Sequence, residues 1–225
     1  MSDNFLPPGY SFDILNNITI LKSYFEFGET NIEKEIELIR QKFYKSPTLT
    51  YKMLKDDPTA FDEEKSRLED MYYENLYNMD MEIRSRFRQS LIIQLFSFME
   101  VHLYKQCELH KKRNHKEYSV KDLNGNSDLD KVAKYIKYSA GIDIKALPHW
   151  RFIDNLRKLR NNIVHKEGRI VDKDSYNGIK EFAVGNFELT KGIDEYEYQI
   201  ILSKRDFIDY CIDEVSRFLH GILIA

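Results

Sequence analysis

The residues best suited to chemistry lie in one short stretch, residues 157–165, which reads RKLRNNIVH. On an α-helix Asn161 and His165 lie one above the other, with Arg160 beside them and Arg157 one turn earlier. Histidine can move a proton near neutral pH, and arginine can hold two phosphate oxygens as charge builds on them. Asparagine can orient the histidine or donate to the phosphate. Cleavage of an RNA phosphodiester needs such groups and no metal ion, because the 2′-hydroxyl supplies the nucleophile.

A simpler explanation of the same residues also stays open. Arginine and histidine near the C-terminus of a helix complement the helix dipole. A pair with the spacing of Arg160 and His165 also arises often by chance in a charged helical protein. The residue types alone therefore fit both a catalytic and a purely electrostatic role.

The helix that must carry these residues is expected over 149–166. Pro148 precedes it, and Gly168 follows at the position where helices often end in a left-handed cap. Phe152, Leu156, Leu159 and Ile163 form its apolar stripe. The candidate catalytic residues lie off that stripe, so the helix presents them away from the core.

Helical spacing of apolar residues predicts a mainly α fold, a helical bundle with a short β-hairpin before the last helix. Other helices are expected over 31–40, with a short piece up to Leu54, and over 59–79, 80–112, 127–140 and 203–222. Their expected N-caps are Thr59, Asp80, either Ser127 or Asp128, and Ser203. The hairpin is expected over 187–202, with Gly192 in its loop. We expect residues 1–79 to be an acidic helical extension packed on a bundle of residues 80–225.

Charge is unevenly distributed along the chain. The 34 basic and 37 acidic residues give a formal net charge of −3, which excludes a strongly basic nucleic-acid coat protein. Residues 56–74 hold eight acids against two bases, whereas residues 145–169 hold seven bases against two acids. These segments are either solvated helix faces or local fields that a polyanion would feel.

The sequence lacks the motifs that are typical of several function classes. The chain has no GxxxxGKS/T or GxGxxG motif, no apolar run of membrane-spanning length and no secretory signal. Cys107 and Cys211 are expected to be free thiols, which favours the cytoplasm. His102, His110 and His115 lie near Cys107 in sequence, but their spacing does not converge on a zinc site. No metal or other cofactor is expected.

The hexapeptide RNNIVH, residues 160–165, resembles the RNxxxH form of the R-x4-6-H motif of the HEPN superfamily. The surroundings are similar too, because an upstream helix at residues 91–106 carries an acid, Glu100, in an apolar face. The motif lies on a later helix, and another helix closes the chain. The resemblance covers residues 80–225.

This resemblance implies a helical bundle, commonly a homodimer, whose composite active site forms where two motif helices meet. His165 would be the acid–base residue, Arg160 would stabilise the transition state, and Asn161 would support them. The RNA products would carry 2′,3′-cyclic phosphate and 5′-hydroxyl ends. Many such proteins are toxins paired with an antitoxin, or act in defence against phage.

Other residues gain candidate roles from this resemblance. Four bases flank the motif and are expected to line a phosphate track: Arg157, Lys158, Lys166 and Arg169. Glu100 is a candidate partner of Arg160, or a simple exposed acid. Trp150 and Tyr176 are candidates for base stacking, or for packing.

One departure from the family pattern matters for regulation. HEPN toxins paired with a nucleotidyltransferase antitoxin continue the motif as H-x-Y, whereas Lys166 and Glu167 follow His165 here. Neutralisation through that tyrosine is therefore not expected. An inactive HEPN-type module that binds RNA, a nucleotide or a partner protein is the alternative function, and a structural scaffold is the third.

Overall fold

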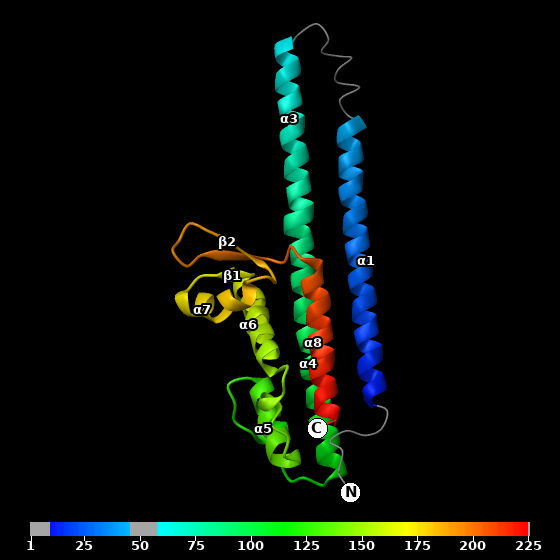
Figure 1. Ribbon diagram of the computed structural model, residues 1–225, viewed down its shortest axis with the longest axis vertical. Helices are drawn as coiled ribbons and strands as arrows, with labels where there is room; N and C mark the ends of the chain where they lie inside the picture. The colour runs from blue at the N-terminus through cyan, green and yellow to red at the C-terminus, as the bar shows by residue number, and fades with distance from the viewer. Residues whose placement is uncertain (1–9, 46–57, 225) are drawn as a thin grey trace.

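The computed structural model describes residues 10–45 and 58–224 and confirms a mainly helical fold with a short hairpin before the last helix (Figure 1). The helices are α1 (Tyr10–Lys45), α3 (Pro58–Tyr77), α4 (Arg84–Arg113), α5 (Asp128–Ala140), α6 (Trp150–Lys166), α7 (Lys173–Ala183) and α8 (Arg205–Ile224). The strands are β1 (Arg169–Ile170), β2 (Glu188–Lys191) and β3 (Tyr198–Ile201). The short helical piece expected up to Leu54 lies outside the described residues.

Helices α3 and α4 form one continuous rod (Figure 1). The π-helical segment Asn78–Ile83 joins them, so the helix start expected at Asp80 is wrong. Asp80 instead pairs with Arg84 one turn later, with 2.7 Å between Oδ1 and Nη1. Because α3 begins at Pro58, Thr59 lies inside the first turn and is not the residue before the helix. The boundary expected between residues 79 and 80 therefore falls within the rod.

Helix α1 begins at Tyr10, well before the expected start at residue 31. Its buried side chains are spaced as one helical face: Ile14, Ile18, Phe25, Ile32 and Ile36. This face packs against α3, α4 and α8. Gly28 permits a close approach to α4, because a Cβ atom at this position would lie 2.0 Å from Cζ of Phe87.

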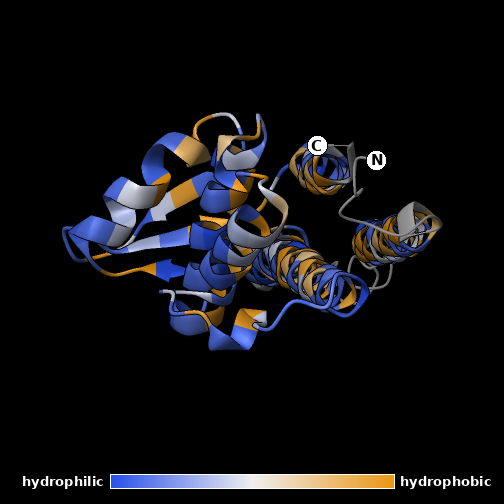
Figure 2. Ribbon diagram, turned by 90° about the horizontal axis from the view of Figure 1, so that it is seen from below, coloured by the Kyte–Doolittle hydropathy of each residue, from blue (hydrophilic) through white to orange (hydrophobic). Residues whose placement is uncertain are grey.

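The core forms between α4 and the helices around it. The stripe predicted for α6 is buried at Leu156, Leu159 and Ile163, whereas Phe152 is only partly buried. Buried apolar side chains also lie at helical spacing on α4 (Leu91, Ile92, Leu95, Phe96, Met99, Leu103) and on α8 (Ile208, Cys211, Ile212, Val215, Phe218, Leu219, Ile222). Figure 2, seen from below, places α1 on one side of α4 and the small sheet on the other. Helix α4 is therefore the central element of the fold.

The sheet holds one strand more than expected. Its strands are antiparallel in the order β1-β3-β2, and β2 and β3 form the predicted hairpin. Strand β1 follows directly from α6, and α7 was also not expected. Asp172 caps α7 by accepting a hydrogen bond from the backbone N–H of Ser175 at 2.8 Å. Ser203 does not cap α8, since its hydroxyl donates to Glu188 and α8 begins at Arg205.

None of the helices within residues 10–45 and 58–224 combines the length and the apolar character that crossing a bilayer requires.

Candidate functional site

Helix α6 begins and ends close to the predicted limits. It covers Trp150–Lys166, and its end is closed by two residues with positive φ, Glu167 at 54° and Gly168 at 75°. The Gly168 N–H donates to the carbonyl of Asn162 at 3.2 Å, as expected of a left-handed helix cap. The apolar stripe faces α4 and α8, so the opposite side of α6 is presented outward.

Arg160 and Asn161 form a connected pair at the edge of the contact between α6 and α4. Nη1 of Arg160 donates a hydrogen bond to Oδ1 of Asn161 at 3.1 Å. The guanidinium carbon lies 5.8 Å from the ring centre of Phe96 on α4, an arrangement in which the ring attracts the cation. Nε of Arg160 is buried without a hydrogen-bond partner among the described residues. The guanidinium is thus held in place while part of its donor capacity stays unused.

His165 lies one helical turn after Asn161 and is exposed. Within residues 10–45 and 58–224 its ring has no hydrogen bond or ion pair. The neighbouring Val164 is also exposed, at 41%. His165 is therefore accessible to a ligand from outside the chain, near the end of a rigid helix.

The four flanking bases each face a carboxylate. Arg157 and Lys158 share Asp154, with N–O distances of 2.8 and 3.0 Å. Burial raises the pKa of Asp154, but hydrogen bonds from these two bases outweigh it and leave the pKa lowered.

The other two flanking bases are paired beyond the end of α6. Nζ of Lys166 lies 2.5 Å from Oδ2 of Asp172. Its hydrogen bond, together with those from the backbone and hydroxyl of Ser175, lowers the pKa of that carboxyl to about 2. Arg169 lies 3.3 Å from Glu167. Arg160, by contrast, has no carboxylate within ion-pair distance among the described residues. A phosphate track beside the motif would therefore have to displace carboxylates that are already in place.

Glu100 lies on α4 on the side that faces α6 and is half-buried. Burial has the largest effect and raises the pKa of Glu100, as does the negative charge of Asp128. The positive charges of Arg160 and Arg157 lower the pKa but do not outweigh burial, so it is raised overall. No hydrogen bond or ion pair joins Glu100 to Arg160 in the described chain. The predicted partnership is therefore electrostatic and acts at a distance.

Phe96 is a site residue that the sequence did not indicate. Its spacing on α4 is typical of a buried core position, and nothing local predicts that its ring would lie under a guanidinium of α6. The candidates for base stacking are both packed within the chain. The ring centres of Trp150 and Phe218 lie 6.1 Å apart, and Tyr176 stacks on Tyr198 with ring centres 4.8 Å apart.

The residues weighed for a zinc site have other contacts within the chain. His102 packs on Phe98, Cys107 is buried in the core with a raised pKa, and His110 contacts Tyr135. The part of the chain that the structure describes holds no group of three or more His, Cys, Asp or Glu that could bind a metal ion.

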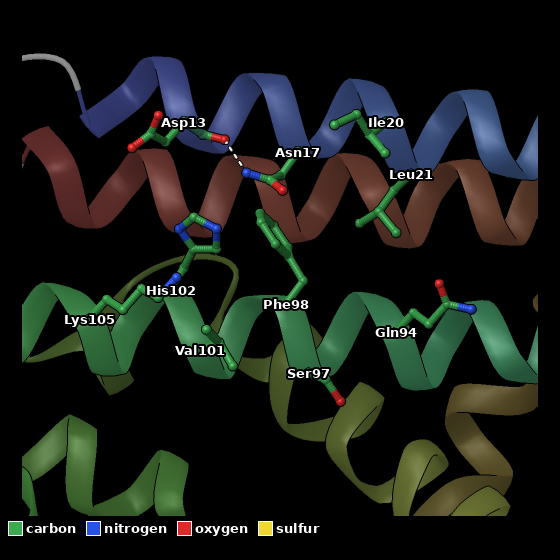
Figure 3. A pocket seen from close by; sticks show the side chains of 10 residues that line it. All are labelled: Asp13, Asn17, Ile20, Leu21, Gln94, Ser97, Phe98, Val101, His102 and Lys105. Atoms are coloured by element: carbon green, nitrogen blue, oxygen red, sulfur yellow. Dashed lines mark hydrogen bonds between the residues drawn. The ribbon is translucent and has the colours of Figure 1, made fainter.

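Two surface grooves run along helix α4, one on each side of its exposed face. One lies between α1 and α4, has a volume of about 560 Å³, and is lined by Asp13, Asn17, Phe98 and His102 among others (Figure 3). The other lies between α4 and α5 and has a volume of about 580 Å³. Glu100 lines the second groove, which therefore begins next to the Arg160 side of α6.

Comparison with known proteins identifies no relative. No family model, curated protein or solved structure matches the chain. Function is therefore inferred from the geometry of Arg160, Asn161 and His165 and from the resemblance of residues 160–165 to the HEPN motif.

Proposed function

We propose that the chain is a HEPN-type, metal-independent endoribonuclease whose reacting groups are Arg160, Asn161 and His165. One observation carries the proposal. Arg160 is held by Asn161 and Phe96 without a carboxylate partner among the described residues, and His165 is exposed five residues further along the same helix. A positioned cation and an accessible acid–base group on one helix suit phosphate chemistry.

The reaction needs only these groups and the RNA itself. The ribose 2′-oxygen attacks the neighbouring phosphorus, the bond from phosphorus to the 5′-oxygen breaks, and a proton passes from the 2′-hydroxyl to the leaving oxygen. His165 exchanges that proton, and Arg160 stabilises the charge on the phosphoryl oxygens. Asn161 keeps the guanidinium in position through its Oδ1 atom. The products carry 2′,3′-cyclic phosphate and 5′-hydroxyl ends.

A homodimer would complete this site. In one copy His165 lies on an outward helix face beside the exposed Val164. A second copy of α6 against this face would cover the apolar side chain and enclose the phosphate between two arginine–histidine sets. One histidine can then remove the proton while the other delivers one.

The proposed biological role is that of a cytoplasmic toxin or phage-defence effector. Uncontrolled cleavage of cellular RNA requires a restraint, so an antitoxin or another defence protein is the expected partner. Because the H-x-Y tyrosine is absent, that partner would act by covering the α6 face.

The test is cleavage of single-stranded RNA by the purified protein in EDTA. His165→Ala should lower the rate by roughly 10²–10⁴-fold, and Arg160→Ala by roughly 10²–10³-fold. Arg151→Ala is the matched control, because Arg151 lies on the same helix and is 88% exposed. Circular dichroism checks that each variant is folded. Cleavage that requires a metal ion, or full activity in both site variants, would overturn the proposal.

A second candidate is a non-catalytic HEPN-type module that binds RNA, a nucleotide or a protein. The carboxylate pairing of Arg157, Lys158, Lys166 and Arg169 favours it, because these bases are less available to grip a substrate. RNA that stays intact after long incubation, while binding to the folded protein is measurable, would support this candidate over the nuclease.

A further inference from the structure

A second group of basic side chains lies around the C-terminal end of α4, away from the motif. Residues 105–122 hold six basic residues against three acidic ones. Among them is a set of five lysines, named here the α4-end lysines: Lys105, Lys111, Lys112, Lys116 and Lys121. In contrast to the four bases that flank the motif, none of the five lies within ion-pair distance of a carboxylate in the described chain.

Complementation of the helix dipole explains only part of this set. Lys111 and Lys112 lie in the last turn of α4, where cations are favourable. Lys105 lies two turns earlier, and Lys121 lies in the short 3₁₀ turn that follows the helix. The dipole falls off within the last turn. Another reason is therefore needed for the cations outside that turn.

The groove between α4 and α5 connects these lysines with the Arg160 side of the molecule. Lys105 and Lys121 line it together with Tyr104 and Glu100. The Tyr104 hydroxyl itself is buried without a hydrogen-bond partner among the described residues. Lys105 also borders the α1–α4 groove (Figure 3).

The groove is lined by two acids, Glu100 and Asp128, as well as by Lys105 and Lys121. Asp128 lies 3.5 Å from Lys131, and the nearby Asp122 accepts hydrogen bonds from the Ser119 backbone and hydroxyl. Lys105 and Lys121 have no carboxylate partner among the described residues, so both can contact phosphate without breaking an ion pair.

We propose that single-stranded RNA binds along α4, with phosphates on the α4-end lysines and the strand following the groove toward Arg160. The choice of RNA as the ligand rests on the proposed function. At 1.5 Å per residue, Lys105 lies roughly 14 Å and Lys112 roughly 24 Å along the helix from Phe96, which contacts Arg160. A strand of several nucleotides can span that length. The α4-end lysines would then provide the affinity for RNA, and the motif residues of α6 would cleave it.

The experiment measures binding of a labelled 2′-O-methyl RNA oligonucleotide, which cannot be cleaved by attack of its own 2′-oxygen, to the full-length protein. The test variant combines Lys105→Gln, Lys112→Gln and Lys121→Gln. The matched control combines Lys22→Gln, Lys134→Gln and Lys137→Gln. These control lysines all pair with carboxylates in the structure. Both variants change the net charge equally, and fluorescence anisotropy is followed as salt is varied.

The test variant should bind at least about tenfold more weakly, and the slope of log affinity against log salt should fall by about 2, at about 0.7 per lost phosphate contact. The control should keep its affinity within about twofold, as expected if paired surface lysines make no phosphate contact. Equal weakening in both variants, or no weakening in the test variant, would overturn the proposal.

Failure of the nuclease proposal gives a different result. Loss of binding in the test variant while the parent protein leaves cleavable RNA intact would support the α4 surface and reject catalysis. Conversely, cleavage that depends on His165 while the test variant binds like the parent would support catalysis and reject this surface.

Discussion

Arg160 differs from the other cations of its helix in the chemistry of its partners. A neutral amide and an aromatic ring hold it, whereas carboxylates hold Arg157 and Lys158. A guanidinium paired with a carboxylate must give up a charged partner before it binds phosphate, and this costs binding energy. Arg160 can accept an anion without that exchange. This difference distinguishes a site residue from a structural one among side chains of the same type.

Glu100 provides a prediction at the residue scale. Because burial raises its pKa in the folded protein, the folded state is penalised as pH rises through the unfolded and then the folded pKa. Glu100→Gln removes that penalty, so the free energy of unfolding at pH 7 should increase by about 0.5 kcal/mol. Urea denaturation at several pH values should show the gain shrinking toward zero in acid, where both carboxyls are neutral. A loss of stability at pH 7 would mean that attraction to Arg160 outweighs desolvation.

At the scale of elements, the contact between α1 and α4 depends on one glycine. Gly28 lies in the middle of α1, where glycine costs about 1 kcal/mol relative to alanine. The ring of Phe87 occupies the space that a side chain would fill, and it also contacts Tyr24 edge to face. The close approach brings Glu29 within reach of Arg88, which binds both of its carboxylate oxygens at 2.7 and 2.8 Å.

Two glycine substitutions test this close contact. Gly28→Ala should destabilise the protein by about 1–3 kcal/mol, because the added methyl group overpacks against Phe87. Gly178→Ala on α7 should instead stabilise it by up to about 1 kcal/mol. The nearest atom to a Cβ at Gly178 is Cδ of Lys158, at 4.0 Å. Urea denaturation measures both changes, and equal effects of the two substitutions would contradict the packing argument.

Elements with a local signal could be predicted, and those without one could not. Helix α5 has its Ser127 cap and its Gly141 stop, and α6 has a clean apolar stripe, so both match expectation closely. Strand β1 has two residues, too few to show a period. The break expected at Asp80 failed because a capping residue type can equally form an ion pair inside a helix.

For the whole molecule, the first helix belongs to the same core as the rest. The buried Phe25 and Ile18 of α1 join the cluster formed by α4 and α8. Arg88 also donates to the carbonyls of Leu202 and Ser203, so Glu29 and Arg88 tie α1 to α4 and to the segment that leads into α8.

A chain that begins at residue 80 should therefore not fold cooperatively. It would expose the partners of five buried α1 side chains, each contributing about 1.5–3 kcal/mol, against a typical net stability of about 5–15 kcal/mol. It would also remove Glu29, the carboxylate that holds Arg88. Near-UV circular dichroism and urea denaturation of residues 80–225 measure this. A sharp transition would show instead that these residues form an independent bundle.

The mainly helical class, the limits of α5 and α6, the hairpin and the motif of residues 160–165 can all be recognised in the sequence. These features follow from periodicity and capping, which act between residues a few positions apart. Which charges are compensated, and how closely α1 approaches α4, became visible in the folded chain. The ion pair of Lys22 with Asp213 and the contact of Gly28 with Phe87 join residues far apart in the chain. Such distances depend on how all the helices pack together, so no local pattern encodes them.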